Sequence, residues 1–220
     1  MATSLQTAET IYKSTWSYRS TFKRCFDLAF TVLLLPVFLP VGLLVALLIK
    51  LDSRGPAIIR VERLGQRGST FHKYKFRSMV LNAERVLQEL LASDTATRKE
   101  YEATYKIRND PRVTRFGRLL RKASLDELPQ VLNILRGEMS WVGPRDILHS
   151  ELERYGESAG KFVTVKPGLT GLWQVSGRSR LTYSERVRLD MHYIDHLSFL
   201  LDLKIILRTV PVVLFGDGAV

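Results

Sequence analysis

Two adjacent carboxylates, Asp126 and Glu127, lie in the segment SLDELPQVLNIL and suit phosphate chemistry. Ser124 followed three residues later by Glu127 is a capping-box pattern that begins a helix. If Asp126 is the effective N-cap, Pro129 falls in the first turn, where its missing N–H is no loss. Both carboxylates would then lie at the positive end of a helix dipole, which also attracts phosphate. From this segment alone, a nucleophile that attacks phosphorus and an ordinary acidic helix cap both remain open.

The basic residues of the chain predict an anionic partner. The sequence has 33 Lys and Arg residues against 22 Asp and Glu residues, a formal net charge of +11, which suits phosphates, nucleic acid or acidic lipid. Because two carboxylates facing a phosphate need a counter-cation, Mg²⁺ held by Asp126 and Glu127 is the expected cofactor. A group of basic residues with helical spacing directly precedes the acidic pair: Arg115, Arg118, Arg121 and Lys122. By itself such a helix face is either solvated or in contact with anionic lipid headgroups.

A second basic segment covers residues 56–79. It alternates like a strand, turns at Gly65 and Gly68, and then continues extended through aromatic residues. This pattern predicts a β-hairpin that carries Lys75 and Arg77 as candidate phosphate ligands. The alternative is a solvated, charged edge strand.

Two later loops add arginines beside turn-forming residues. The segment GEMSWVGPRD carries Arg145, and VKPGLTGLWQVSGRS carries Arg178 together with Trp173. Loops that combine arginine with an aromatic ring suit the phosphate and base of a nucleotide, although scaffolding turns have the same composition.

An uncharged apolar run, Leu28–Ile49, is the element that would hold these residues at a membrane. Its 22 residues are long enough to cross a bilayer as a helix. Pro36 and Pro40 interrupt its middle, and both flanks carry basic residues, which prefer the cytoplasmic side of a membrane. The residues leave two interpretations open, a re-entrant helix-break-helix and a single-pass anchor with a kink.

The two ends of the chain are less informative. The first 20 residues are rich in Ser and Thr and have no apolar core, so we expect a poorly ordered tail. Charged residues interrupt the apolar stretch Leu197–Phe215, which favours an interfacial or core-packed helix over a span. The single cysteine, Cys25, cannot form an internal disulfide.

Several long motifs together resemble one protein family, the bacterial sugar transferases, also called monotopic phosphoglycosyl transferases. In chain order these motifs are FKRCFDLAF, ALLIKLDSRGP, RLGQRGSTFHKYKFRSM, DPRVTRFGRLLRKASLDELPQVLNILRGEMSWVGPR and PGLTGLWQVSGRS. The resemblance implies transfer of a sugar-1-phosphate from a UDP-sugar to polyprenyl phosphate, with Mg²⁺ and release of UMP. It also implies a re-entrant membrane segment on the cytoplasmic face.

The resemblance assigns roles to individual residues. Asp126 matches the nucleophile that forms a covalent phosphosugar intermediate, and Glu127 matches its acidic partner near the metal. Asp190 matches a further acidic position near the site. The family's phosphate-binding positions are matched here by Lys75, Arg121 and Arg145.

The sequence departs from the family pattern in two places. Leu39 precedes Pro40 where Ser-Pro is common, and Pro36 is additional. The family's PRP motif reads Pro-Arg-Asp here, with Asp146 in place of the second proline. The chain resembles the short, stand-alone members that begin exopolysaccharide synthesis with galactose or glucose.

The expected fold is therefore mainly α-helical with a small β element. We expect a flexible tail at residues 1–21, a proline-broken re-entrant membrane segment at 22–50, and a cytoplasmic catalytic domain at 51–220 with an interfacial C-terminal helix. The expected location is the cytoplasmic face of the bacterial inner membrane. Expected partners are a UDP-sugar, polyprenyl phosphate and membrane lipids, without nucleic acid, and a homodimer stays open.

Two other functions remain as alternatives. A non-catalytic, membrane-anchored scaffold for polysaccharide assembly would not need the acidic pair. A membrane-tethered nucleic-acid-binding protein would account for the positive charge through salt-sensitive binding, but it leaves the acidic pair unexplained.

Overall fold

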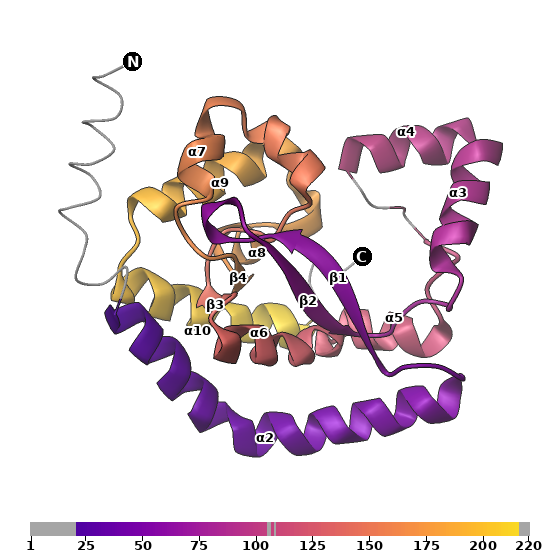
Figure 1. Ribbon diagram of the computed structural model, residues 1–220, viewed down its shortest axis with the longest axis horizontal. Helices are drawn as coiled ribbons and strands as arrows, with labels where there is room; N and C mark the ends of the chain where they lie inside the picture. Colours follow the sequence, from indigo (N-terminus) through magenta and orange to yellow (C-terminus); the bar gives the residue numbers. More distant parts are fainter. Residues whose placement is uncertain (1–20, 105–106, 108, 216–220) are drawn as a thin grey trace.

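The computed structural model describes residues 21–104, 107 and 109–215, and these form a mainly helical protein with short β elements (Figure 1). This agrees with the expected fold class. The expected N-terminal tail lies outside the described residues except for Thr21.

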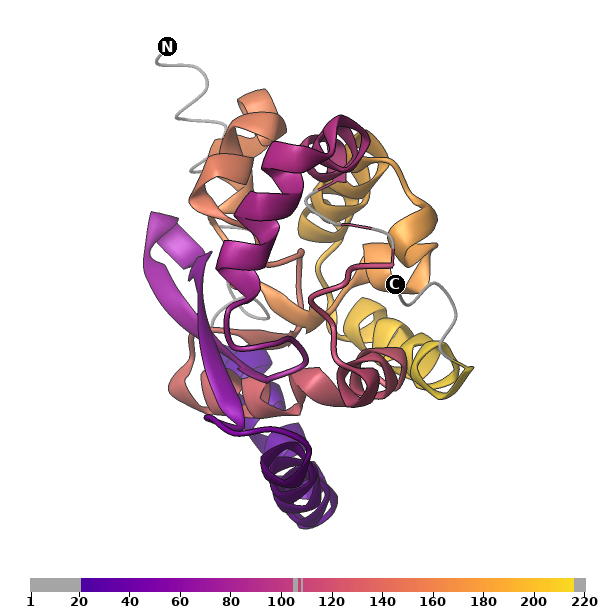
Figure 2. The same ribbon diagram turned by 90° about the vertical axis from the view of Figure 1, so that its right-hand side faces the viewer.

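The apolar run forms one long helix, α2 (Lys23–Asp52), with Pro36 and Pro40 inside it. Figure 1 shows that α2 bends in its middle, and in Figure 2 the helix projects below the rest of the protein. Among the described residues, α2 is the one helix whose length and apolar composition suffice to cross a membrane; only 11% of its most apolar stretch is buried in the protein. The helix continues through both prolines, so the expected break is a bend within one helix.

Contacts at its start and in its middle tie α2 to the globular part of the protein. At its start, Lys23 forms an ion pair with Asp202, and Arg24 donates to the backbone carbonyls of Ile134 and Leu135. In its middle, Trp141 packs against aromatic rings on both sides of Pro36. The ring centroids of Phe30 and Phe38 lie 5.0 and 5.9 Å from that of Trp141. The bend therefore follows the surface of the protein.

The expected basic hairpin is present. Strand β1 (Ile58–Leu64) pairs antiparallel with β2 (Thr70–Phe76), and a short 3₁₀ turn, η2 (Gln66–Gly68), joins them. Arg67 in the turn has a positive φ of 61°. Side chains of β2 that point inward pack on the core, so the hairpin is a packed element that carries its basic residues at defined positions.

Most remaining elements are short helices. After the hairpin come two helices, α3 (Ala83–Ser93) and α4 (Thr95–Thr104), which are separated at Asp94. A second, parallel pair of strands consists of β3 (Ser140–Val142) and β4 (Gly168–Thr170). The other helices are α5 (Arg115–Lys122), η3 (Leu125–Gln130), α6 (Val131–Arg136), η4 (His149–Ser158), α7 (Ala159–Phe162), α8 (Leu172–Val175), η5 (Arg178–Arg180), α9 (Tyr183–Asp195) and α10 (Phe199–Phe215).

The C-terminal helix α10 has one buried and one exposed face. Asp202 and Ile205 are buried, whereas Leu200 and Leu207 are exposed. The helix continues through Pro211. Its polar anchor is Asp202, which pairs with Lys23 of α2. The exposed leucines add to the apolar surface that α2 presents.

A hydrophobic cluster connects α2 to the segment that contains the acidic pair. Val45 and Ile49 of α2 are buried against Phe76 of β2 and Leu120 of α5. Leu125 and Leu128 of η3, which flank the two carboxylates in the sequence, pack against the same cluster. The second half of α2 therefore supports the 3₁₀ helix on which Asp126 lies.

Candidate active site

The backbone around the acidic pair differs from the expected helix cap. Ser124 adopts a left-handed conformation with φ of 54°, and the 3₁₀ helix η3 begins at Leu125. No side-chain cap is formed at this end, so the capping box with Glu127 and the N-cap role of Asp126 are both wrong. Asp126 lies inside the first turn of η3, and Pro129 lies in its last turn, where the 3₁₀ geometry accommodates it. Tertiary contacts to the hairpin engage the two carboxylates instead.

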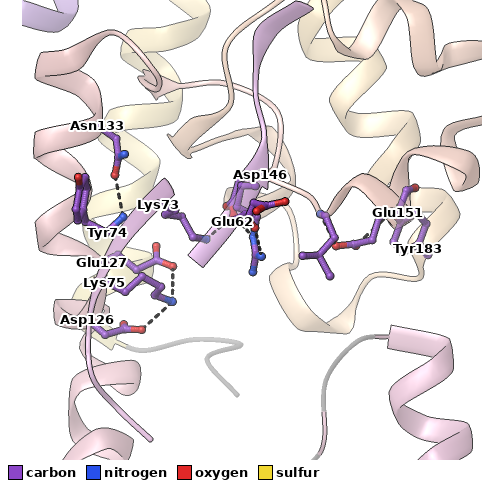
Figure 3. Close-up of polar contacts among 12 residues, drawn as sticks. Glu62, Lys73, Tyr74, Lys75, Asp126, Glu127, Asn133, Asp146, Glu151 and Tyr183 are labelled. Atoms are coloured by element: carbon purple, nitrogen blue, oxygen red, sulfur yellow. Dashed lines mark hydrogen bonds and ion pairs between the residues drawn. The ribbon is translucent and has the colours of Figure 1, made fainter. Parts of the chain in front are cut away.

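Lys75 on β2 joins both carboxylates (Figure 3). Its Nζ lies 2.9 Å from Oδ2 of Asp126 and 3.3 Å from Oε1 of Glu127. Burial by itself would lower the pKa of Lys75, but the two carboxylates outweigh burial and raise it above its ordinary value. Asp126 is buried, while Glu127 is partly exposed. The expected neighbourhood of Lys75, Asp126 and Glu127 is therefore present in the fold.

Arg121 approaches this group from the end of α5. Its Nε donates to Oγ of Ser78 at 3.0 Å. Burial lowers the pKa of Arg121, and the charge of Asp126 acts in the opposite direction. The close contact of α5 with the backbone at Ser78 requires Gly117, because a Cβ there would lie 2.0 Å from the Ser78 carbonyl oxygen. The expected charged face of α5 thus reaches the acidic pair through its last turn.

Arg178, the candidate phosphate ligand in the loop after α8, also lies near the acidic pair. It begins η5, and its Nη2 donates to Oγ of Ser124 at 3.2 Å. Ser124 directly precedes η3, so Arg178 lies beside the start of the segment that holds Asp126.

Arg77 has a different position from the one expected of a phosphate ligand. It is buried, and its guanidinium donates to the carbonyls of Ser53 and Arg54 and to Oγ of Ser53, each at 2.8 Å. These acceptors follow the C-terminal end of α2. The structure therefore uses Arg77 to hold the end of α2 and does not bring it into the acidic cluster.

Arg145 and Asp190 meet each other in a second polar group. The backbone N–H of Arg145 donates to Oδ1 of Asp190 at 3.3 Å, and the Tyr155 hydroxyl donates to Oδ2 at 2.9 Å. Burial outweighs these hydrogen bonds and raises the pKa of Asp190 to about 7. The Arg145 guanidinium lies 5.6 Å from the centroid of the Trp173 ring.

Sequence reasoning did not identify the ion pairs of Asp146, which lie between the acidic pair and the group of Arg145 and Asp190. Asp146 accepts from Nζ of Lys73 on β2 and from Nε of Arg63 on β1, the latter at 2.9 Å. Burial would raise the pKa of Asp146, but these two cations dominate and lower it to about 2. Figure 3 shows Lys73 and Asp146 between the acidic pair and the Glu151–Tyr183 contact. The departure of Asp146 from the PRP pattern was the available signal, because a partly buried carboxylate in place of proline needs cationic partners.

The acidic pair has suitable donors for a magnesium ion. Mg²⁺ is bound through one or two carboxylates together with substrate phosphates and water, and Asp126 and Glu127 supply two neighbouring carboxylates. Within the described ranges, no group of three or more His, Cys, Asp or Glu side chains forms a ready-made metal cage. The donor set therefore fits a metal that arrives with a phosphorylated substrate.

The comparison with known proteins identifies the class of protein to which this fold and site belong. A model of the bacterial sugar transferase family matches residues 18–216. The chain therefore belongs to the bacterial sugar transferase family, as its motifs predicted, and is by class a phosphoglycosyl transferase.

Individual relatives differ in length. The chain is 47% identical to an exopolysaccharide production protein, ExoY, of Sinorhizobium fredii, and the match covers 90% of this chain and 87% of the relative. It is 46% identical to an undecaprenyl-phosphate galactose phosphotransferase of Salmonella typhimurium over 90% of this chain and 41% of that protein. An undecaprenyl-phosphate glucose phosphotransferase of Komagataeibacter xylinus is 41% identical over 90% of this chain and 36% of its own length. The chain thus spans less than half of the latter two proteins.

Proposed function

We propose that this protein transfers a hexose-1-phosphate from a UDP-sugar to undecaprenyl phosphate and releases UMP, with Asp126 as the nucleophile. The observation that carries the proposal is the contact of Lys75 with both carboxylates, on a 3₁₀ helix that packs against α2. The names of the relatives support the reaction class and the polyprenyl acceptor, and they include both galactose and glucose transferases.

In the first half-reaction, an Asp126 carboxylate oxygen attacks the phosphorus that bears the sugar. The bond from this phosphorus to the bridging oxygen breaks, and UMP leaves with the electron pair. Lys75 holds the carboxylate in place, and Arg121 and Arg178 lie where they can neutralise charge on the transferring phosphoryl group. Mg²⁺ bound by Asp126 and Glu127 would supply charge stabilisation at the phosphate oxygens.

In the second half-reaction, a phosphate oxygen of the lipid attacks the aspartyl phosphosugar and regenerates the Asp126 carboxylate. This acceptor lies in a membrane, whereas the donor is dissolved in water. The exposed apolar surface of α2 and α10 and the bend in α2 support a re-entrant association with the cytoplasmic face of the membrane. Packing of η3 on α2 would then hold Asp126 at the boundary between the two substrates.

The experiment is UMP release from a panel of UDP-sugars with undecaprenyl phosphate, compared between wild type and Asp126→Asn. We expect wild type to release UMP with one sugar of the panel and Asp126→Asn to lose at least about a thousandfold in rate. An exposed carboxylate variant, Asp52→Asn, is the control and should retain activity. Full activity of Asp126→Asn would contradict the nucleophile, and a scaffold or a nucleic-acid-binding protein would release no UMP with any sugar.

A further inference from the structure

A buried group of hydrogen-bond donors surrounds Trp173, away from the acidic pair. The guanidinium carbons of Arg145 and Arg186 lie 5.6 and 5.4 Å from the centroid of the Trp173 ring. Arg186 is only 4% exposed and Trp173 9%. The three residues come from three elements: the loop after β3, helix α8 and helix α9. We call them the Trp173 cluster.

The Trp173 cluster contains donors without acceptors. Among the described residues, Nη1 of Arg145, Nε1 of Trp173 and Nε of Arg186 are buried and have no hydrogen-bond partner. Neither guanidinium forms an ion pair within that part of the chain. The neighbouring Gln174 carries another buried side-chain atom without a partner, its Oε1. Buried arginines are normally paired, so this concentration of unsatisfied donors requires an explanation.

The charges around Arg186 also indicate a site for an anion. Burial lowers the pKa of Arg186, and the like charge of Arg145 lowers it further. Glu151 acts against this effect from a distance, but its own oxygens accept from the Leu148 N–H at 3.0 Å and the Tyr183 hydroxyl at 3.4 Å. The Asp190 carboxyl also lies near both arginines, but its oxygens accept from the Arg145 backbone N–H and the Tyr155 hydroxyl. Two cations beside one ring, with three unpaired donor atoms, fit an acceptor-only anion, and phosphate oxygens are such acceptors.

The Trp173 cluster adjoins the catalytic residues on two sides. Arg145 directly precedes Asp146, which accepts from Lys73, and Lys73 lies near Lys75 and Glu127. On the other side, α8 is followed after two residues by η5, whose Arg178 donates to Ser124. A nucleotide with a phosphate in this cluster would therefore extend toward Asp126.

We propose that Arg186 and Trp173 complete, with Arg145, a binding site for a phosphate group of the nucleotide. The inference rests on the proposed function, in which a UDP-sugar is the donor. It adds Arg186, which no sequence motif indicated, and gives Trp173 a defined role as a donor to phosphate. Arg145 and Arg186 donate to the phosphate oxygens through their guanidinium groups, and Trp173 donates through Nε1–H. The site binds the donor before transfer and UMP after it, so it acts on affinity and leaves the attack by Asp126 unchanged.

The test is equilibrium binding of UDP to the full-length protein in detergent. Arg186→Gln should weaken binding by about ten- to a hundredfold, because one charged donor to phosphate is lost. Arg188→Gln is the matched control, since Arg188 lies two residues further on the same helix and is exposed. Trp173→Phe keeps an aromatic side chain but removes the indole N–H together with part of the ring, so its loss should be about three- to tenfold. In turnover assays, both variants should raise KM for the UDP-sugar more than they lower kcat.

The outcomes separate this inference from the proposed function. Unchanged UDP affinity in Arg186→Gln, relative to Arg188→Gln, overturns the inference even if wild type releases UMP normally. Failure of wild type to bind UDP also overturns it. Weakened UDP binding in the variant, with no UMP release by wild type from any UDP-sugar, supports the nucleotide site and refutes the transfer reaction. If circular dichroism shows that Arg186→Gln does not fold, Trp173→Phe carries the test, and unchanged affinity in that variant is then the overturning result.

Discussion

The acidic cluster of Lys75, Asp126 and Glu127 and the Trp173 cluster solve the problem of buried charge in opposite ways. In the first, a cation from the hairpin compensates two carboxylates at 2.9 and 3.3 Å. In the second, two guanidinium groups face one indole ring, and their buried donors have no acceptor among the described residues. A cluster whose charges are paired is stable without a ligand, whereas a cluster of unpaired cations is stabilised most by binding an anion. This difference underlies the two proposals, chemistry at the first cluster and nucleotide binding at the second.

The largest effect should come from breaking the compensated cluster. Lys75→Met removes the cation that contacts both carboxylates. Asp126 and Glu127 then repel each other, and the Asp126 nucleophile loses its position. We expect turnover of UDP-sugar to fall by about a hundredfold or more, while the affinity for UDP changes little. Lys99→Met, at an exposed position on α4, is the control. Equal activity of the two variants would show that Lys75 does not position Asp126.

An arginine outside both clusters should affect stability and leave chemistry intact. Arg77→Met removes the donors to the carbonyls of Ser53 and Arg54 at the end of α2. Leaving these partly buried acceptors unpaired should cost about 2–3 kcal/mol in the free energy of unfolding. The melting temperature in detergent measures this loss, with the exposed Arg115→Met as control. A variant that melts like wild type but turns over slowly would place Arg77 in the active site after all.

A third effect should be a pH dependence of stability near the Trp173 cluster. The pKa of Asp190 is raised from 3.8 to about 7 by burial, so between these values the native state binds a proton that the unfolded state has released. The free energy of unfolding should therefore fall as pH rises from about 4 to 7. Asp190→Asn cannot titrate, and its melting temperature should decline less than that of wild type between pH 5 and 7. Parallel curves for the two proteins would refute the raised pKa.

Local patterns in the sequence were sufficient for the hairpin, for α5 and for the long apolar helix. Alternation around Gly65 and Gly68 specifies a hairpin, and helical spacing of the arginines specifies α5. The same local reasoning failed at η3, where we expected a capping box between Ser124 and Glu127 or an N-cap at Asp126 and neither is formed. There, contact with Lys75 from a distant strand determines where the carboxylates point.

The site could be predicted only where a motif identified it. Lys75, Arg121 and Arg178 do lie around the acidic pair, but Arg77, two residues from Lys75, is turned to α2. Arg186 carries no signal in the sequence, because an arginine on a mixed helix normally reaches solvent. Its burial against Trp173 depends on how α8 and α9 pack, which neither composition nor spacing specifies.

The most direct test of the catalytic assignment is peptide mass spectrometry of protein trapped with its UDP-sugar in the absence of lipid acceptor. The account predicts one hexose phosphate on the peptide that contains Asp126, and its disappearance when undecaprenyl phosphate is added. An unmodified Asp126 under these conditions, in protein that still releases UMP at its normal rate once the acceptor is present, would contradict it.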